Sequence, residues 1–157
     1  MSRVQLALNV ADVDQAVAFY STLFATEPAK RRPGYANFAV SDPPLKLVLI
    51  EDATQQPGSL NHLGVEVETA EEVAAAQKRL AAEGLATAVQ DEVACCHAVQ
   101  DKVWVDGPGG ESWEVYTVLS DIEMPEGGLK AGDPGGAACC ATRPDHAATD
   151  TASSSCC

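Results

Sequence analysis

VQLALNV at residues 4–10 and NHLGVEV at residues 61–67 are two copies of one pattern, 57 residues apart (62 − 5 = 57). Both segments alternate or run apolar over the length of a strand, as half-buried and buried strands do. A polar side chain stands at the same place in each copy, Gln5 in the first and His62 in the second. The chain therefore contains an internal duplication, and the duplication sets the expected fold.

Each copy continues in the same way. A helix with a start signal follows the strand: Asp12 fits an N-cap in the first copy, and Thr69 with Glu72 forms a capping box in the second. Strand candidates separated by turn residues come next, at residues 36–40, 45–50, 102–105 and 112–119. We expect an α+β fold of two tandem βαβββ modules, at about residues 3–52 and 60–119.

From about Ser120 the composition changes. Gly, Ala, Pro, Asp, Thr and Ser dominate residues 120–157, periodicity is absent, and few large apolar residues remain. Such a segment cannot bury enough surface to offset the entropy lost in ordering it. We expect one ordered domain, residues 1–119, followed by a flexible, disordered tail that carries four of the six cysteines.

The formal net charge is -13, from 23 acidic and 10 basic residues. This balance argues against binding nucleic acid or an anionic membrane by bulk electrostatics. No apolar run approaches membrane-spanning length, and the first residues lead into the strand pattern without a signal peptide. We expect a soluble, cytoplasmic protein with no nucleic-acid and no membrane partner.

The cysteines occur as three adjacent pairs: Cys95-Cys96, Cys139-Cys140 and Cys156-Cys157. Neighbouring Cα atoms lie about 3.8 Å apart across a trans peptide, which is below the usual range for a disulfide. Without a signal peptide, reduced thiols that bind a soft, thiophilic centre are therefore favoured over a disulfide framework. The first pair lies in residues 91–97, which we interpret as a loop; the alternative for this pair is two small buried hydrophobic side chains.

Several stretches within residues 3–119 carry a family resemblance: YANFA at 35–39, PPLKLVL at 43–49, LNHLGVEV at 60–67, QDKVWV at 100–105 and WEVYT at 113–117, together with the Cys95-Cys96 pair. They resemble the organoarsenical carbon–arsenic lyases, which are non-haem iron dioxygenases, and the related cadmium-induced proteins. Both belong to the vicinal oxygen chelate superfamily of glyoxalases, bleomycin resistance proteins and extradiol dioxygenases. The resemblance implies a half-barrel of the vicinal oxygen chelate type. It also implies Fe(II)- and O2-dependent cleavage of the C–As bond in trivalent organoarsenicals.

The resemblance further implies that Gln5, His62 and Glu114 are catalytic and bind Fe(II), and that Cys95 and Cys96 bind the arsenic of the substrate. One imidazole nitrogen, one carboxylate and one amide oxygen leave open positions, as a catalytic metal site requires. The set departs by one residue from the 2-His-1-carboxylate arrangement. Each donor has another interpretation: His62 as a satisfied core residue, Glu114 as half of a buried salt bridge, and Gln5 as an exposed polar residue.

Further residues near these donors are not expected to add metal ligands. The first-module counterpart of the carboxylate is Leu47 or Val48, neither of which can ligate, so three protein ligands are expected. His97 either lowers the pKa of the adjacent thiols or faces water. Lys102 and Trp104 are interpreted as ordinary strand residues.

Two functions from different classes follow. The favoured one is an enzyme that holds a monosubstituted As(III) on the dithiol beside a redox metal. It would release arsenite from methylarsonous acid or trivalent aromatic arsenicals and so serve arsenic detoxification. The alternative is a non-catalytic cytosolic thiol protein that binds Cd(II) or As(III); a thiol transferase of the resistance type is a more distant third. Release of arsenite beyond one equivalent separates an enzyme from a trap, since a trap also binds metal.

Overall fold

The computed structural model describes residues 2–95 and 98–121; residue 1, residues 96–97, residues 122–157 and the side chain of Cys95 lie outside that part. The first module contains β1 (Arg3–Val10), α1 (Val13–Phe24), β2 (Lys30–Arg32), β3 (Tyr35–Ser41) and β4 (Pro44–Glu51). The second contains β5 (Leu60–Glu66), α2 (Ala70–Ala82), β6 (Thr87–Cys95), β7 (Ala98–Asp106) and β8 (Ser112–Asp121). The predicted α+β fold of two βαβββ modules is confirmed.

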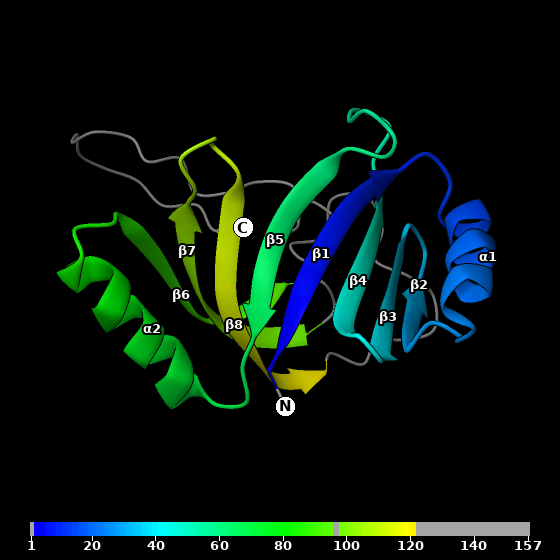
Figure 1. The fold of residues 1–157 in the computed structure, drawn as a ribbon. Helices are drawn as coiled ribbons and strands as arrows, with labels where there is room; N and C mark the ends of the chain where they lie inside the picture. The colour runs from blue at the N-terminus through cyan, green and yellow to red at the C-terminus, as the bar shows by residue number, and fades with distance from the viewer. Residues whose placement is uncertain (1, 96–97, 122–157) are drawn as a thin grey trace.

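The eight strands form one open, mixed sheet in the order β2-β3-β4-β1-β5-β8-β7-β6 (Figure 1). The first strand of each module pairs in parallel with the last strand of the same module, β1 with β4 and β5 with β8. The two first strands pair with each other in antiparallel fashion at the centre. The modules are therefore joined edge to edge, and residues from both meet along the β1–β5–β8 strip.

The register between the modules follows the duplication. Leu6 lies opposite Leu63, Gln5 opposite Gly64, and Ala7 opposite His62. When each residue is replaced by its equivalent in the other module, 57 positions away, Leu6–Leu63 maps onto itself, because 6 + 57 = 63. The pairs Gln5–Gly64 and Ala7–His62 exchange, because 5 + 57 = 62 and 7 + 57 = 64. The two copies are thus related by a local two-fold rotation about the Leu6–Leu63 pair, which places equivalent side chains on the same face.

Both predicted helix starts are present. The side chain of Asp12 accepts a hydrogen bond from the Gln15 backbone N–H at the start of α1, and Thr69 and Glu72 form a complete capping box at the start of α2. Each cap satisfies backbone N–H groups that have no partner within the helix. Among the described residues, no helix is long and apolar enough to cross a bilayer.

The helices cover one face of the sheet, α1 over β3 and β4 and α2 over β6, β7 and β8. Under α1 lies the larger core; its buried members are Val10, Val13, Val17, Ala36, Phe38, Val40, Leu47 and Leu49. Burial of a side chain such as Phe38 or Leu49 stabilises the fold by about 1.5–3 kcal/mol. Leu6 and Leu8 pack against this core. Strand side chains alternate between faces, so Gln5 lies on the opposite face, which the helices leave open.

Two segments differ from expectation. Residues 91–95 form the end of strand β6 rather than a loop, and the prediction of a loop there was wrong. A bulge explains the error: the pairing with β7 shifts register between Gln90 and Val93, and Glu92 adopts a positive φ of 49°. The extra polar residues interrupt the alternation by which a strand is recognised. Strand β8 also continues to Asp121, two residues past the predicted domain end.

Candidate metal centre and the adjoining cavity

Three adjacent strands bring the predicted metal ligands together. Gln5 comes from β1, His62 from β5 and Glu114 from β8, and their side chains are only 4%, 6% and 3% exposed. Gln5 is therefore not the exposed polar residue that was its alternative interpretation. Gly64 pairs with Gln5 on one side and with Glu114 on the other, so all three strands are in register at this point. Gln5 and Glu114, which are 109 residues apart in the sequence, are therefore in direct contact in the sheet.

The three polar groups form a compact triangle. Nε2 of Gln5 lies 3.0 Å from Nε2 of His62 and 2.7 Å from Oε1 of Glu114, and His62 Nε2 lies 3.3 Å from Glu114 Oε1. Two ligands at right angles on a metal, each about 2.1 Å away, lie about 3.0 Å apart. The sides of the triangle are therefore close to those of one face of an octahedron. The donor set of nitrogen and oxygen atoms suits Fe(II) and similar ions.

The amide of Gln5 is held in one orientation. Its Nε2 donates to Glu114, and its Oε1 accepts a hydrogen bond of 2.6 Å from the hydroxyl of Tyr116. A half-turn about the terminal torsion exchanges the two amide atoms, which then presents Oε1, the ligating atom, to His62 and Glu114. A hydroxyl can accept as well as donate, so Tyr116 can support both orientations. The residues present fit a metal ion.

A side-chain network sets the ring of His62. Nδ1 of His62 lies 2.7 Å from Oδ1 of Asn61, which can only accept, so Nδ1 carries the proton and Nε2 keeps its lone pair toward Gln5 and Glu114. Nδ2 of Asn61 in turn donates to Oδ1 of Asn9 at 2.8 Å. The ring also meets Trp104 edge to face at a centroid distance of 5.4 Å. This arrangement gives His62 the tautomer that metal ligation requires.

Glu114 is ionised although it is buried. Burial raises its pKa, but the charge of Lys102 is the largest of the effects that lower the pKa, to about 2. Nζ of Lys102 donates to Oε2 at 3.0 Å. This is the buried salt bridge that was the alternative interpretation of Glu114. It occupies Oε2 and leaves Oε1 facing Gln5 and His62.

The register also identifies the first-module counterpart of Glu114. Ala7 of β1 pairs with Val48 of β4, just as its equivalent Gly64 pairs with Glu114. Val48 is buried and apolar. Of the two residues proposed from the sequence, Val48 is therefore the equivalent one, and it cannot ligate.

Only part of the predicted thiol site is described. The backbone of Cys95 ends strand β6 and pairs with Ala98 at the start of β7, while Cys96 and His97 lie outside the described residues. The described residues contain no group of three His, Cys, Asp or Glu residues that could hold a metal, because one member of the triangle is an amide. The interpretation of Cys95 and Cys96 as the arsenic-binding pair stays a prediction.

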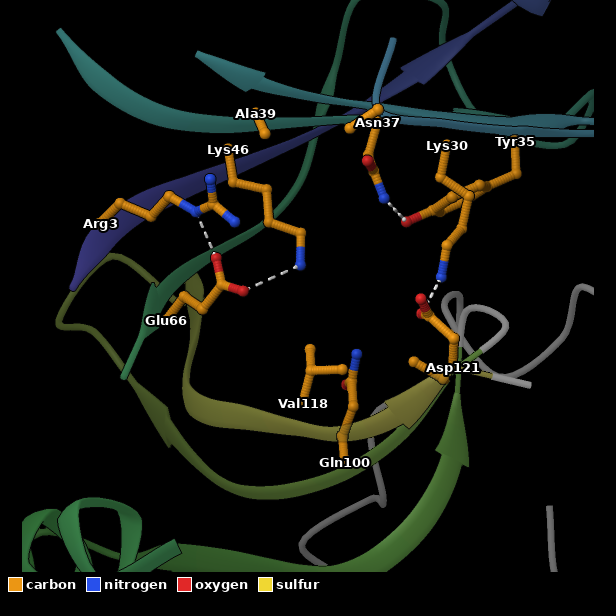
Figure 2. A pocket seen from close by; sticks show the side chains of 12 residues that line it. Arg3, Lys30, Tyr35, Asn37, Ala39, Lys46, Glu66, Gln100, Val118 and Asp121 are labelled. Carbon is orange, nitrogen blue, oxygen red and sulfur yellow. Dashed lines mark hydrogen bonds and ion pairs between the residues drawn. The ribbon is translucent and has the colours of Figure 1, made fainter. Parts of the chain in front are cut away.

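A polar cavity of about 230 Å³ adjoins the triangle on the open face of the sheet (Figure 2). Strands of both modules enclose it, and Figure 2 shows their side chains pointing inward from opposite sides. Its lining residues are Arg3, Ala29, Lys30, Tyr35, Asn37, Ala39, Lys46, Glu66, Ala98, Gln100, Val118 and Asp121. Nζ of Lys46 lies 4.9 Å from the ring centre of Tyr116. Tyr116 therefore links the cavity-lining Lys46 to Gln5, and Ala98 of the lining pairs with Cys95 at the end of β6.

Residues 3–115 match the model of the Glyoxalase/Bleomycin resistance protein/Dioxygenase superfamily. The chain belongs to this superfamily. Two relatives are similar to it over most of its length. The Trivalent organoarsenical cleaving enzyme of Thermomonospora curvata is 54% identical over 157 residues, which is 100% of both chains. The cadmium-induced protein CadI of Mycobacterium bovis is 63% identical over 123 residues, 78% of this chain and 80% of CadI.

Solved structures agree with the superfamily fold. The Mn(II)-bound glyoxalase from Novosphingobium aromaticivorans superposes with a TM-score of 0.55 at 18% identity, over 80% of this chain and 44% of that chain. Homoprotocatechuate 2,3-dioxygenase from Arthrobacter globiformis gives a TM-score of 0.54 at 18% identity, over 76% of this chain and 36% of that chain. At this level of identity the likeness establishes the fold alone.

Sequence reasoning missed several residues of this superfamily domain. Lys102 and Trp104 were interpreted as ordinary strand residues, yet Lys102 contacts Glu114 and Trp104 contacts His62. Tyr116 was not singled out either. A signal was present: Lys102 alternates with the apolar residues Val103 and Val105 but shares their strand, and a charged residue that is buried in a strand needs a partner. The partner lies on the neighbouring strand, which the sequence alone does not identify.

Proposed function

We propose that this chain cleaves the carbon–arsenic bond of trivalent organoarsenicals, with Fe(II) held by Gln5, His62 and Glu114 and with O2 as co-substrate. The observation that carries the proposal is the triangle of donors, with sides of 2.7–3.3 Å, in a chain 54% identical to a Trivalent organoarsenical cleaving enzyme over its full length. Three protein ligands leave coordination positions for other molecules.

The thiol pair would hold the arsenic. A monosubstituted As(III) has one bond to carbon and two exchangeable positions, so the thiolates of Cys95 and Cys96 together complete its coordination. Inorganic As(III) has three exchangeable positions and is best held by three thiolates. A dithiol therefore retains the organic substrate better than the inorganic product, and this difference favours release after cleavage. The backbone pairing of Cys95 with Ala98 puts this strand end beside the cavity.

The overall reaction balances with O2 as the only oxidant. One methylarsonous acid and one O2 give one formaldehyde and one arsenous acid, so the carbon is oxidised, O2 is reduced, and all atoms are conserved. Bound Fe(II) would supply O2 binding and activation, which the side chains cannot provide. A trivalent aromatic arsenical would give an oxygenated aromatic product instead of formaldehyde.

The chain's own residues would hold the site in order. Asn61 keeps Nδ1 of His62 protonated and Nε2 free to ligate. Lys102 neutralises Glu114 from the side of Oε2, so the carboxylate is stable when buried and Oε1 remains available. Burial of the three donors excludes water from their side of the site, which strengthens electrostatic interactions there.

A thiol protein that captures Cd(II) or As(III) without turnover is the second candidate, because the chain is 63% identical to the cadmium-induced protein CadI over 123 residues. The buried triangle favours the enzyme. A thiol trap has no need of an imidazole, a carboxylate and an amide collected from three strands, and burying a charged group such as Glu114 carries a cost.

The test uses the purified full-length protein. It is loaded anaerobically with Fe(II), given an excess of methylarsonous acid and then exposed to air. The proposal predicts arsenite well beyond one equivalent per chain, formaldehyde in equal amount, and no product without O2 or without Fe(II). Binding of one equivalent of arsenical with no arsenite formed would instead identify a trap.

A further inference from the structure

The cavity beside the donor triangle is positively charged in a strongly acidic protein. Arg3, Lys30 and Lys46 face Glu66 and Asp121 across it, three cations against two carboxylates, whereas the whole chain carries -13. A buried charge that is not compensated is costly, so an excess cation in a cavity points to a ligand that supplies the missing anion.

Lys46 is the cation in excess. Arg3 makes the short contact with Glu66, 2.5 Å from Nε to Oε2, while Nζ of Lys46 lies 3.6 Å from Oε1, an ion pair too long for a hydrogen bond. Lys30 is paired with Asp121 (Figure 2). Only 8% of Lys46 is exposed, and burial lowers its pKa. Its ammonium group lies in the cavity with donor capacity that Glu66 does not use.

A buried amide provides a second donor. Gln100 is 6% exposed, and its side-chain amide points into the cavity in Figure 2. A side-chain amide can donate two hydrogen bonds and can also accept, so it can bind a polar group of a ligand there. The side-chain amide of Gln100, from the second module, and the ammonium of Lys46, from the first, thus line the same cavity from opposite strands. Together they suit an oxygen group that accepts from both.

The cavity adjoins both parts of the proposed site. Ala98 in its lining pairs through the backbone with Cys95, where the proposed function holds arsenic, and Lys46 in its lining contacts Tyr116, which donates a hydrogen bond to Gln5 of the donor triangle. Its volume of about 230 Å³ is below the roughly 300–1,000 Å³ typical for drug-sized ligands. A single substituted ring is the size of group that such a cavity holds.

Building on the proposed function, we infer that this cavity is a specificity subsite for a carboxylate on the organic group of the arsenical, and that Lys46 is the residue that selects it. The carboxylate accepts from Nζ of Lys46 and from the amide of Gln100. An arsenical whose substituent is polar but uncharged loses the charge-assisted hydrogen bond, which is about twice as strong as a neutral one.

The test compares two arsenicals of the same shape, 4-carboxyphenylarsine oxide and 4-carbamoylphenylarsine oxide. Both are titrated into metal-free, full-length protein in which the four cysteines of residues 122–157 are replaced by serine. We expect the carboxylate to bind about tenfold or more tightly than the carboxamide. Lys46→Met should bring this ratio close to one, and Lys46→Arg should preserve most of it. Lys78→Met, which removes an exposed charge on α2, should leave the ratio unchanged.

The inference is wrong if the protein with Lys46 in place binds the two arsenicals equally tightly. It is also wrong if Lys46→Met still binds the carboxylate more tightly than the carboxamide by the same ratio. The first comparison needs no subsite variant, so the inference remains testable if Lys46→Met fails to fold. Gln100→Leu should weaken binding of both arsenicals. Arsenite release is measured in parallel after Fe(II) loading. If methylarsonous acid gives no arsenite in this parallel assay, the proposed function fails, while the binding ratio still reports on the cavity.

Discussion

Gly64 lies opposite Glu114 in the parallel pair of β5 and β8, and a Cβ on Gly64 would come within 3.2 Å of Glu114 Cγ and of Gln5 Cβ. The missing side chain is what lets the two donors approach across β5. The equivalent residue of the first module is Ala7, whose partner Val48 has no role in ligation. The position that pairs with the apolar Val48 therefore carries an alanine, whereas the position between Gln5 and Glu114 carries a glycine.

Gly64→Ala should separate the donors while leaving the fold in place. The new methyl group presses on both Gln5 and Glu114, and such overpacking costs about 1–3 kcal/mol. We expect a slightly lower melting temperature and Fe(II) affinity reduced by about tenfold or more. Calorimetric titration with Fe(II) under anaerobic conditions measures the affinity. Unchanged affinity would mean that the triangle of donors is not the metal site.

Loss of individual ligands should be graded. His62→Ala removes the imidazole that Asn61 orients, so we expect loss of turnover and of most Fe(II) binding. Gln5→Ala removes a neutral, weaker ligand and should retain part of the metal binding. Iron content and arsenite release are measured together. Full turnover and full iron content in His62→Ala would contradict the assignment, whatever Gln5→Ala does.

Cys95→Ser and Cys96→Ser should each abolish C–As cleavage while leaving Fe(II) binding nearly intact. Either change removes the chelate, and with it the high effective concentration of the second thiolate. The variants are prepared in the full-length protein without the four cysteines of residues 122–157, so that other thiols do not capture the arsenical. Tight binding of phenylarsine oxide by either serine variant would show that the pair is not the substrate site.

Truncation after Asp121 should leave activity unchanged, whereas truncation after Leu119 should lower the stability of the fold. Residues 122–157 contain few of the large apolar side chains that packing requires, so removing them should leave turnover at saturating substrate unchanged. Cutting after Leu119 also removes Ser120 and Asp121, which pair with β7, and the ion pair between Asp121 and Lys30. We expect a lower melting temperature for the shorter form. Loss of turnover in the protein truncated after Asp121 would show that residues 122–157 take part in catalysis.

Glu66 should contribute to the pH dependence of stability. Burial raises its pKa, but the hydrogen bond from Arg3 and the charge of Lys46 lower it below the ordinary 4.5. A carboxyl group with a lowered pKa in the folded state stabilises the fold above its unfolded pKa, and the contribution is lost as the pH falls through the folded pKa. Glu66→Gln should therefore lower stability at pH 7 and weaken its dependence on pH below about 4.5. The exposed Glu27→Gln is the control in acid unfolding followed by circular dichroism.

The duplication, the βαβββ order and the equivalence of Gln5 and His62 can all be predicted from the amino-acid sequence. These rest on local signals: strand alternation, the caps at Asp12 and Thr69, and an offset of 57 residues that the pairing of Leu6 with Leu63 repeats. Glu114 could be named only through a family resemblance. Its link to the other donors depends on which strand lies beside β5, and no local pattern states that.

The tertiary structure alone decided what surrounds the donors. Lys102 and Tyr116 are ordinary members of strand patterns in sequence, and they meet Glu114 and Gln5 because the sheet places β7 and β8 next to β5 and β1. The cavity, with Lys46 and Gln100 on opposite walls, also exists only when the two modules join edge to edge. Side-chain periodicity fixes which face a residue occupies, but long-range strand pairing fixes its neighbours, and the neighbours give a buried polar group its chemistry.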